Sequence, residues 1–201
     1  MISMRISALV SLALLLASPI TRADLERAVA LARFPHSDAE RTRFHDRYLT
    51  VVGHASAPVT TTPVVFQLEV ITEFRRVELL VEEHDRVEDL FGRGGTDDVV
   101  EAMRPWRNKV AVGAYLLLPG GSDAAVPPVD IVVDGVGGEP ARLATRAAFH
   151  TRSSLHPTVL ADAVVDAVFD AGKIGATTRT VHVLVDRREI AQADINFSTV
   201  D

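Results

Sequence analysis

Three aspartates, Asp162, Asp166 and Asp170, recur at intervals of four residues toward the C-terminal end of the chain. Residues four apart share one side of a strand, and also one side of a helix. Clustered carboxylates are the usual ligands of Ca²⁺ or Mg²⁺. In a strand, however, neighbouring carboxylates of this row are about 13 Å apart, which is too far for one ion. We therefore expect a solvated polar row and not a metal site.

Two histidines upstream of this row suggest a second kind of metal chemistry. His150 and His156 flank a predicted loop, and Asp162 follows it. If these three side chains converge, they supply the nitrogen and oxygen ligands of a catalytic metal. Helical zinc sites place two histidines four residues apart, and no pair among the seven histidines has that spacing. We therefore predict no bound cofactor and keep a metal-assisted hydrolase as an alternative.

The single tryptophan, Trp106, lies between Arg104 and Arg107. An aromatic ring with two guanidinium groups can recognise a carboxylate ligand by stacking and ion pairing. Trp106 also follows Pro105 at the expected end of a helix, where a large aromatic side chain more often fills the core. Core filling is our preferred interpretation of Trp106, and Arg104, Trp106 and Arg107 are the candidate binding patch.

The elements that position these residues follow from hydrophobic periodicity. Residues 24–50 predict a helical hairpin, in which Ser37 and Glu40 form a capping box that starts the second helix. That helix should carry Phe44, Tyr48 and Val51 on one side. Further along the chain, the pattern predicts a strand over residues 64–71, a helix over residues 72–91 and a short helix from Thr96 to Pro105.

From Lys109 onward the pattern changes to short strands separated by turn residues. Strands are predicted over residues 109–118, 129–133, 146–151, 180–185 and 190–197. Residues 162–170 fit either a helix or a strand. We prefer a strand, because a period of two places Ala163, Val165, Ala167 and Phe169 on one face and the aspartates on the other. The predicted fold is α+β, with N-terminal helices packed on a C-terminal antiparallel sandwich of immunoglobulin-like or Greek-key type.

Residues 1–23 have the layout of a secretory signal peptide. A short head that contains Arg5 precedes an apolar run over residues 6–17, and the segment ends at the small residue Ala23. The apolar run is shorter than the roughly 20 residues that a spanning helix needs. We predict cleavage after Ala23, export to the periplasm or the medium, and no stable membrane span in the mature protein.

Residues 24–201 have the length of one domain, which we divide into a mainly helical part, 24–108, and a sandwich part, 109–201. They contain 19 basic and 27 acidic residues, a formal net charge of −8 with neutral histidine. Nucleic-acid binding needs a basic face, so this charge argues against it. The chain has no cysteine, which excludes disulfides and thiol nucleophiles. Almost all basic residues are arginine, which we interpret as the codon bias of a GC-rich bacterium.

These observations favour a non-enzymatic binding module that recognises a protein or small ligand in the bacterial cell envelope. Sandwiches often present loops and edges to partners, although that argument rests on analogy between folds. The metal-assisted hydrolase built from His150, His156 and Asp162 is one alternative. The other is an envelope assembly factor that pairs an exposed strand edge with its client.

Overall fold

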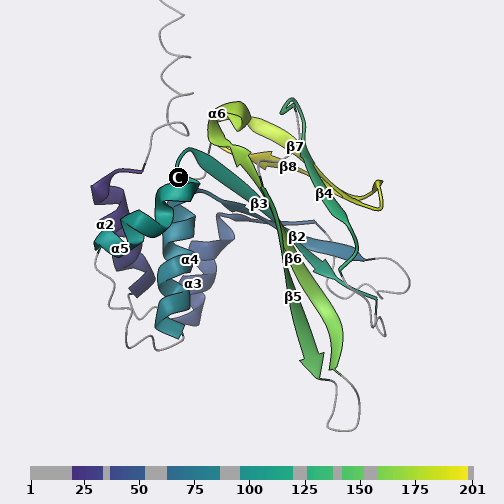
Figure 1. Cartoon of the computed structure of the whole chain (residues 1–201), viewed down its shortest axis with the longest axis horizontal. Coiled ribbons are helices and arrows are strands. Elements are labelled where there is room, and N and C mark those ends of the chain that lie inside the picture. Colours follow the sequence, from purple (N-terminus) through teal and green to yellow (C-terminus); the bar gives the residue numbers. More distant parts are fainter. Residues whose placement is uncertain are drawn as a thin grey trace, which may run out of the picture.

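The structure is a computed structural model, which describes residues 20–33, 37–52, 63–86, 96–119, 126–137, 142–151 and 158–198. These residues form helices and two antiparallel sheets, which confirms the predicted α+β class (Figure 1). The helices form a layer at one end of the molecule, beside the larger sheet. Residues 1–19 of the predicted leader lie outside the described part of the chain.

The helical layer is built from amphipathic helices that bury their apolar sides against one another. Its elements are α2 (Arg22–Arg33), α3 (Asp38–Asp46), α4 (Glu73–Arg86), α5 (Thr96–Met103) and the 3₁₀ turn η1 (Arg104–Trp106). Leu25 and Ala28 of α2 share a buried cluster with Phe74 and Val77 of α4. The helix predicted over residues 72–91 is therefore confirmed as far as Arg86, and residues 87–91 lie outside the described part.

The capping box is present, but the helix that it starts is shorter than predicted. The Ser37 side chain accepts from the Glu40 amide, and the Glu40 carboxylate accepts from the Ser37 amide. The helix ends at Asp46, and the next residues form the edge strand β1 (Leu49–Val51). The prediction was wrong at Val51, which is 74% exposed. Hydrogen bonds to a strand more than a dozen residues away outweigh the helical spacing of this segment.

The larger sheet has five strands and the smaller sheet has three. The larger sheet runs in the order β1, β2 (Val64–Ile71), β3 (Lys109–Leu117), β6 (Thr158–Asp170) and β5 (Arg142–Thr151). The smaller sheet runs in the order β4 (Val129–Val133), β7 (Thr178–Val185) and β8 (Arg188–Asn196). A short helix, α6 (Ala171–Ile174), links β6 to β7. The larger sheet thus takes two strands from the N-terminal half of the chain.

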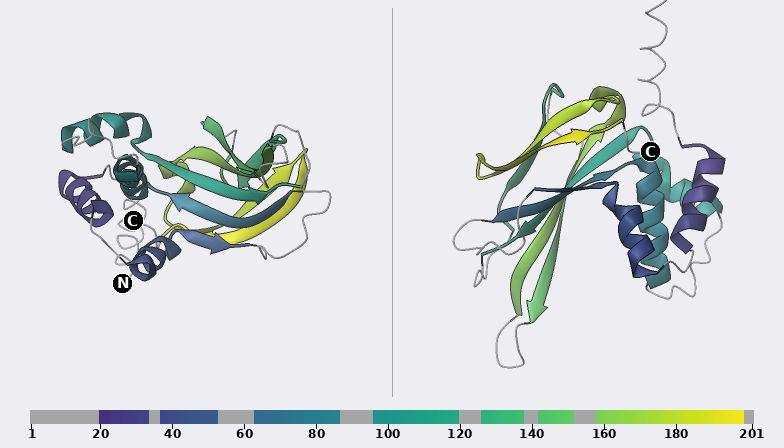
Figure 2. Two further views of the ribbon diagram at one scale, coloured as in Figure 1. Left: turned by 90° about the horizontal axis from the view of Figure 1, so that it is seen from below. Right: turned by 180° about the vertical axis from the view of Figure 1, so that it is seen from behind.

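The two sheets share one apolar core. Val112 of β3, Val165 of β6, Val183 of β7 and Phe197 all belong to it. The strand predicted over residues 162–170 is confirmed, and its apolar residues do face inward as expected from the period of two. The other face of the larger sheet is turned toward the helical layer, as Figure 2 shows from two further directions. We call this second face of the larger sheet the helix-facing side.

Strands β5 and β6 extend beyond the rest of the larger sheet. The pairing of β3 with β6 ends at Leu117 and Asp162, whereas β6 begins at Thr158 and continues to pair with β5 alone. The two strands therefore form an arm that projects from the sheet (Figure 1). Within the described residues, no helix is long and apolar enough to cross a membrane.

Candidate functional site

A row of residues with buried carboxylates crosses the helix-facing side of the larger sheet. Glu69 of β2 is paired with Gly113 of β3, and Gly113 is paired with Asp166 of β6. Because Gly113 has no side chain, the Asp166 carboxylate lies over it: a Cβ at Gly113 would come within 2.8 Å of the Asp166 Oδ1 atom. Glu69 is 2% exposed and Asp166 is 7% exposed. Two carboxylates thus lie under the helical layer, where an unpaired charge is costly.

The guanidinium of Arg75 on helix α4 lies against this row. Its Nε atom is 3.0 Å from Glu69 Oε1, and its Nη1 atom is 3.5 Å from Glu78 Oε2. The same Nη1 atom lies 3.9 Å from Glu82 Oε1. Tyr115 of β3 donates its hydroxyl to the other oxygen of Glu69. Arg75 therefore joins helix α4 to the sheet through charge-assisted hydrogen bonds.

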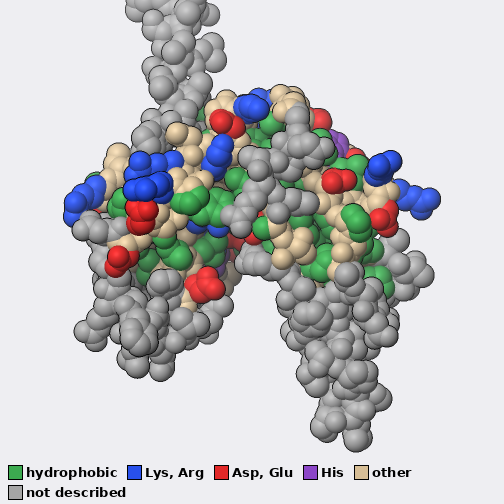
Figure 3. All heavy atoms as spheres, viewed as in Figure 1, with side chains coloured by type: hydrophobic (Ala, Val, Ile, Leu, Met, Phe, Trp, Pro, Cys, Tyr) green, Lys and Arg blue, Asp and Glu red, His purple; other side chains and the backbone are tan. Residues whose placement is uncertain are grey.

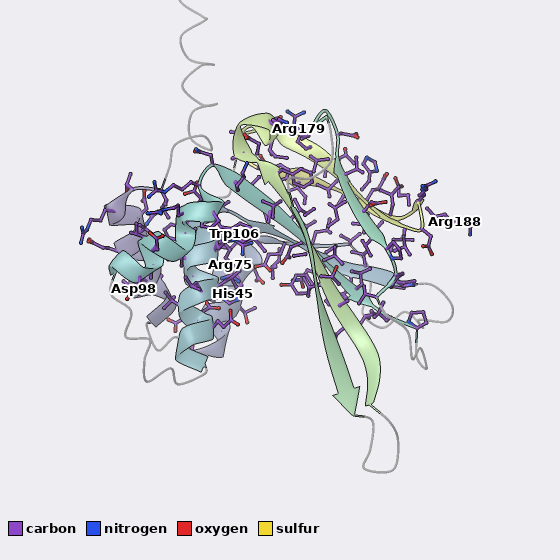
Figure 4. The ribbon with its side chains drawn as sticks, in the orientation of Figure 1. His45, Arg75, Asp98, Trp106, Arg179 and Arg188 are labelled. Carbon is purple, nitrogen blue, oxygen red and sulfur yellow. The ribbon has the colours of Figure 1, made fainter. Side chains whose placement is uncertain are left out.

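Residues at the end of helix α3 complete the set of charges. The Nη2 atom of Arg47 is 3.8 Å from Glu78 Oε1, and it donates a hydrogen bond to the hydroxyl of Tyr48. The Nε2 atom of His45 is 3.0 Å from Glu82 Oε1. Figure 4 shows Arg75 and His45 on the side of the helical layer that faces the sheets. We call Arg47, Glu69, Arg75, Glu78 and Glu82 the buried charge cluster.

Glu78 has the most unusual environment in the buried charge cluster. Its side chain is fully buried, and its Oε1 atom has no hydrogen-bond partner in the described part of the chain. Burial raises the pKa of Glu78 to about 7, although Arg75 and Arg47 oppose this change. Burial also raises the pKa of the Tyr48 hydroxyl. Glu78 therefore retains a proton under conditions in which an exposed glutamate is ionised.

The arrangement can store a proton, but its geometry does not favour proton transfer to a substrate. A general acid or base must reach the reacting atom of the substrate, directly or through one water. Glu78 is 0% exposed, and its neighbours Glu69 and Arg75 are 2% and 3% exposed. Perturbed carboxyl groups mark candidate functional sites, and they also occur in ion-pair networks that join structural elements. The contacts of Glu78 with Arg75 and Arg47 are those of an ion-pair network that joins structural elements.

The buried charge cluster is not among the sites predicted from the sequence, although the sequence contains a weak signal for it. Residues 64–71 are apolar except for Gln67 and Glu69, and an acidic residue is unusual in a strand with this composition. Arg75, Glu78 and Glu82 recur at helical spacing and form a charged stripe beside the apolar stripe of the same helix. Only the tertiary structure brings that stripe against Glu69.

The aspartates of β6 lie on the helix-facing side, but they have three different environments. The expectation of a solvated row was wrong for Asp166, which is buried because Gly113 leaves room for it. Asp170 accepts from the amide of Gly172 and lies 3.7 Å from Lys109 Nζ. Asp162 is half-buried and is paired with Leu117 across the strands. The three aspartates therefore share one face of β6 but differ in burial and surroundings.

The candidate metal ligands are not brought together by the residues that the structure describes. His150 belongs to β5, but its side chain and the whole of His156 lie outside the described part. Among the described residues, no group of three or more histidine, aspartate or glutamate side chains could hold a metal ion. The convergence of His150, His156 and Asp162 stays a prediction.

The candidate binding patch lies at the junction of the helical layer and the sheet. Arg104 and Arg107 are exposed. Figure 3 shows that several basic side chains gather over the helical layer. Arg104 pairs with Glu101 at 2.8 Å. The Trp106 ring is half-buried and packs against the cluster of Ile71 and Val168. The guanidinium of Arg76 stacks on this ring, with its central carbon 3.5 Å from the ring centroid. Trp106 thus has the predicted core role, whereas a ligand-binding role for the three residues stays a prediction.

No protein-family model, curated protein sequence or solved structure matches this chain. Its function has to be inferred from the placement and the contacts of its own residues.

Proposed function

We propose that this protein is a non-enzymatic binding module of the bacterial cell envelope that engages a protein partner along strand β5. The observation that carries this proposal is the position of β5 at the outer edge of the five-stranded sheet. β5 is ten residues long, from Arg142 to Thr151, and within the described sheet it pairs with β6 alone. An edge strand presents a row of backbone donors and acceptors that another chain can extend by strand addition.

The projecting arm supports the same proposal. Beyond Asp162, the register pairs β6 only with β5, so this end of the arm lies outside the sandwich. A partner strand can approach the arm without displacing the helical layer, which lies at the other end of the sheet (Figure 2). The immunoglobulin-like or Greek-key character predicted for the sandwich is part of this proposal, because such folds present edges to partners.

Export to the periplasm or the medium is the second half of the proposal. It rests on residues 1–23, whose charged head, apolar run and small final residue fit a secretory signal. The absence of cysteine is compatible with either address, since a chain of this length can bury a sufficient core without disulfides.

Site-specific photocrosslinking in producing cells tests the proposed interface. A photoreactive side chain at Thr145, an exposed residue of β5, should capture a discrete partner. The matched control is Gln192, an exposed residue of β8, which is an edge strand of the smaller sheet. Capture from Gln192 with none from Thr145 would contradict the assignment to β5.

Proline substitutions show whether capture depends on strand pairing. Successive residues of an antiparallel strand point their amides alternately toward the neighbouring strand and away from it. Of Leu143→Pro and Ala144→Pro, one should weaken the pairing with β6, and the other should remove only an outward donor. The outward variant should fold and lose capture at Thr145. The proposal fails if the variant that lacks only an outward amide retains full capture at Thr145. It also fails if the purified protein shows enzymatic turnover that is lost when one polar residue is substituted.

A further inference from the structure

One buried guanidinium faces three carboxylates between helix α4 and the larger sheet. Arg75 is 3% exposed, and its nitrogens lie 3.0 Å from Glu69, 3.5 Å from Glu78 and 3.9 Å from Glu82. Glu69 has the shortest of these contacts and also accepts from Tyr115. Glu82 also contacts His45 and is 24% exposed, so water reaches it. Glu78 alone is both fully buried and short of a close cation.

The groups that face Glu78 come from each element packed against it. Helix α4 contributes Arg75 and Glu82, the segment after helix α3 contributes Arg47 and Tyr48, and β2 contributes Glu69 through Arg75. The second oxygen of Glu78 has Arg47 at 3.8 Å, beyond hydrogen-bond distance. Arg47 is 35% exposed, which weakens its field at Glu78 by screening. The negative charge of an ionised Glu78 is therefore only partly balanced by nearby cations while helix α4 is packed on the larger sheet.

We propose that Glu78 is a proton-dependent latch that holds helix α4 against the larger sheet. The protonated carboxyl is accommodated in its buried position, and the closed arrangement is then favoured. The ionised carboxylate gains hydration when helix α4 moves away from the sheet, so ionisation favours opening. Opening uncovers the part of the helix-facing side around Ala111, which packs with Ile71, Val168 and Leu79 of helix α4. This inference goes beyond the proposed partner site and does not depend on it.

The direction of the pH dependence follows from the two states of Glu78. Burial raises the pKa of Glu78 to about 7 in the closed structure, whereas a solvated glutamate has a value near 4.5. Between these values the closed form binds the proton and the open form does not. The stabilising effect of the proton is complete below pH 4.5 and is lost as the pH rises through about 7. The equilibrium constant for opening should therefore rise by up to about tenfold per pH unit in this window.

Thiol labelling measures this opening directly, because the chain has no cysteine of its own. Ala111→Cys places a thiol under helix α4, where Ala111 is 1% exposed. Ala167→Cys places a control thiol in the core between the two sheets, where Ala167 is 0% exposed. The ratio of the two labelling rates with a pyridyl disulfide removes most of the intrinsic pH dependence of thiol reactivity. We expect this ratio to rise by up to about 40-fold between pH 5 and pH 7.

Two matched variants decide whether Glu78 is the group responsible. In Glu78→Gln the amide imitates the protonated carboxyl, so the ratio should stay level between pH 5 and pH 7. Glu83→Gln changes a neighbouring exposed glutamate of the same helix and should leave the rise intact. The latch is disproved if the ratio of the Ala111→Cys and Ala167→Cys labelling rates does not change with pH in protein that retains Glu78. It is also disproved if the ratio rises equally in protein that carries Glu78→Gln. The first of these results needs no variant at Glu78, so the test does not depend on the folding of Glu78→Gln.

Discussion

His182 on strand β7 is an imidazole held between two carboxylates on the outer face of the smaller sheet. Its Nδ1 atom is 2.7 Å from Glu189 Oε2, and its Nε2 atom is 3.3 Å from Asp134 Oδ1. A neutral imidazole has a hydrogen on only one nitrogen, whereas the imidazolium can donate to both acids. The hydrogen bond to Glu189 is the largest cause that raises the pKa of His182. His182 thus links strand β7 to strand β8 and to the residue that follows strand β4.

The pH dependence of stability should carry the signature of His182. Because folding raises its pKa, the stabilisation is complete below pH 6.5 and is lost as the pH rises through the higher folded value. The two acids are 48% and 63% exposed, so we expect a contribution of about 0.2–1 kcal/mol. Urea unfolding from pH 6 to pH 9 should show this loss in the native protein and not in His182→Asn.

A matched control separates this effect from that of Glu78. Glu78→Gln should alter the pH dependence below about pH 7 and leave the His182 step above pH 6.5 in place. An unchanged slope in His182→Asn would show that the two ion pairs contribute nothing measurable.

At the scale of the elements, the β7–β8 hairpin contains a costly turn. Asp186 and Arg187 connect the strands and have φ values of 49° and 64°. Positive φ at both central positions is typical of a type I′ turn, which favours asparagine or aspartate followed by glycine. Asp186 fits that preference, whereas Arg187 carries a Cβ in the left-handed region at a steric cost. The connection is two residues long and is therefore shorter than the gap between the strands predicted over residues 180–185 and 190–197.

Arg187→Gly should stabilise the protein. Removal of the Cβ relieves the left-handed strain, and the greater freedom of glycine in the unfolded chain offsets part of the gain. We expect a net increase of about 0.5–1 kcal/mol in the free energy of unfolding, measured by chemical denaturation. Arg188→Gly is the control, because Arg188 begins strand β8 and should lose stability on the same change. A loss in both variants would show that Arg187 makes contacts that outweigh its strain.

At the scale of the whole molecule, the predicted leader and the first helix overlap. Helix α2 begins at Arg22, ahead of the predicted cleavage site after Ala23. Thr21 caps this helix: its hydroxyl is 2.6 Å from Asp24 Oδ2, and it accepts from the Asp24 amide. The amide of Ile20 donates to Glu73 of helix α4. Cleavage after Ala23 would remove all of these contacts from the mature protein.

N-terminal sequencing of protein recovered from the producing cells tests the cleavage site. We expect Asp24 as the first residue, since Ala23 is the small residue that ends the signal pattern. Cleavage there removes Arg22 and Ala23 of helix α2 together with the Thr21 cap, so the shortened helix should show faster hydrogen exchange in its first turn than protein that retains residues 20–23. A first residue at or before Ile20 would place cleavage upstream and keep the cap. A retained leader would refute the proposed export.

The amino-acid sequence alone determined the local elements whose two sides differ in polarity. Strand β6 was predicted from alternating apolar residues and aspartates, and a strand was predicted over residues 190–197, where β8 lies; both are confirmed. Strand β2 was predicted at its observed bounds, residues 64–71. These predictions succeed because burial of one face imposes a period of 2 or 3.6 on the residues of the element itself.

Tertiary structure decided where distant segments meet, and the sequence pattern could not. Residues 49–51 join the sheet because β2 supplies their hydrogen bonds, although their helical spacing suggested otherwise. Asp166 is buried because Gly113 lies opposite on another strand. The pKa of Glu78 is raised because its side chain is fully buried between helix α4 and the larger sheet, and Arg75, which Glu78 shares with Glu69 of β2, only partly opposes this change. Each outcome depends on pairing and packing between elements, and a local period carries no information about which partners will be chosen.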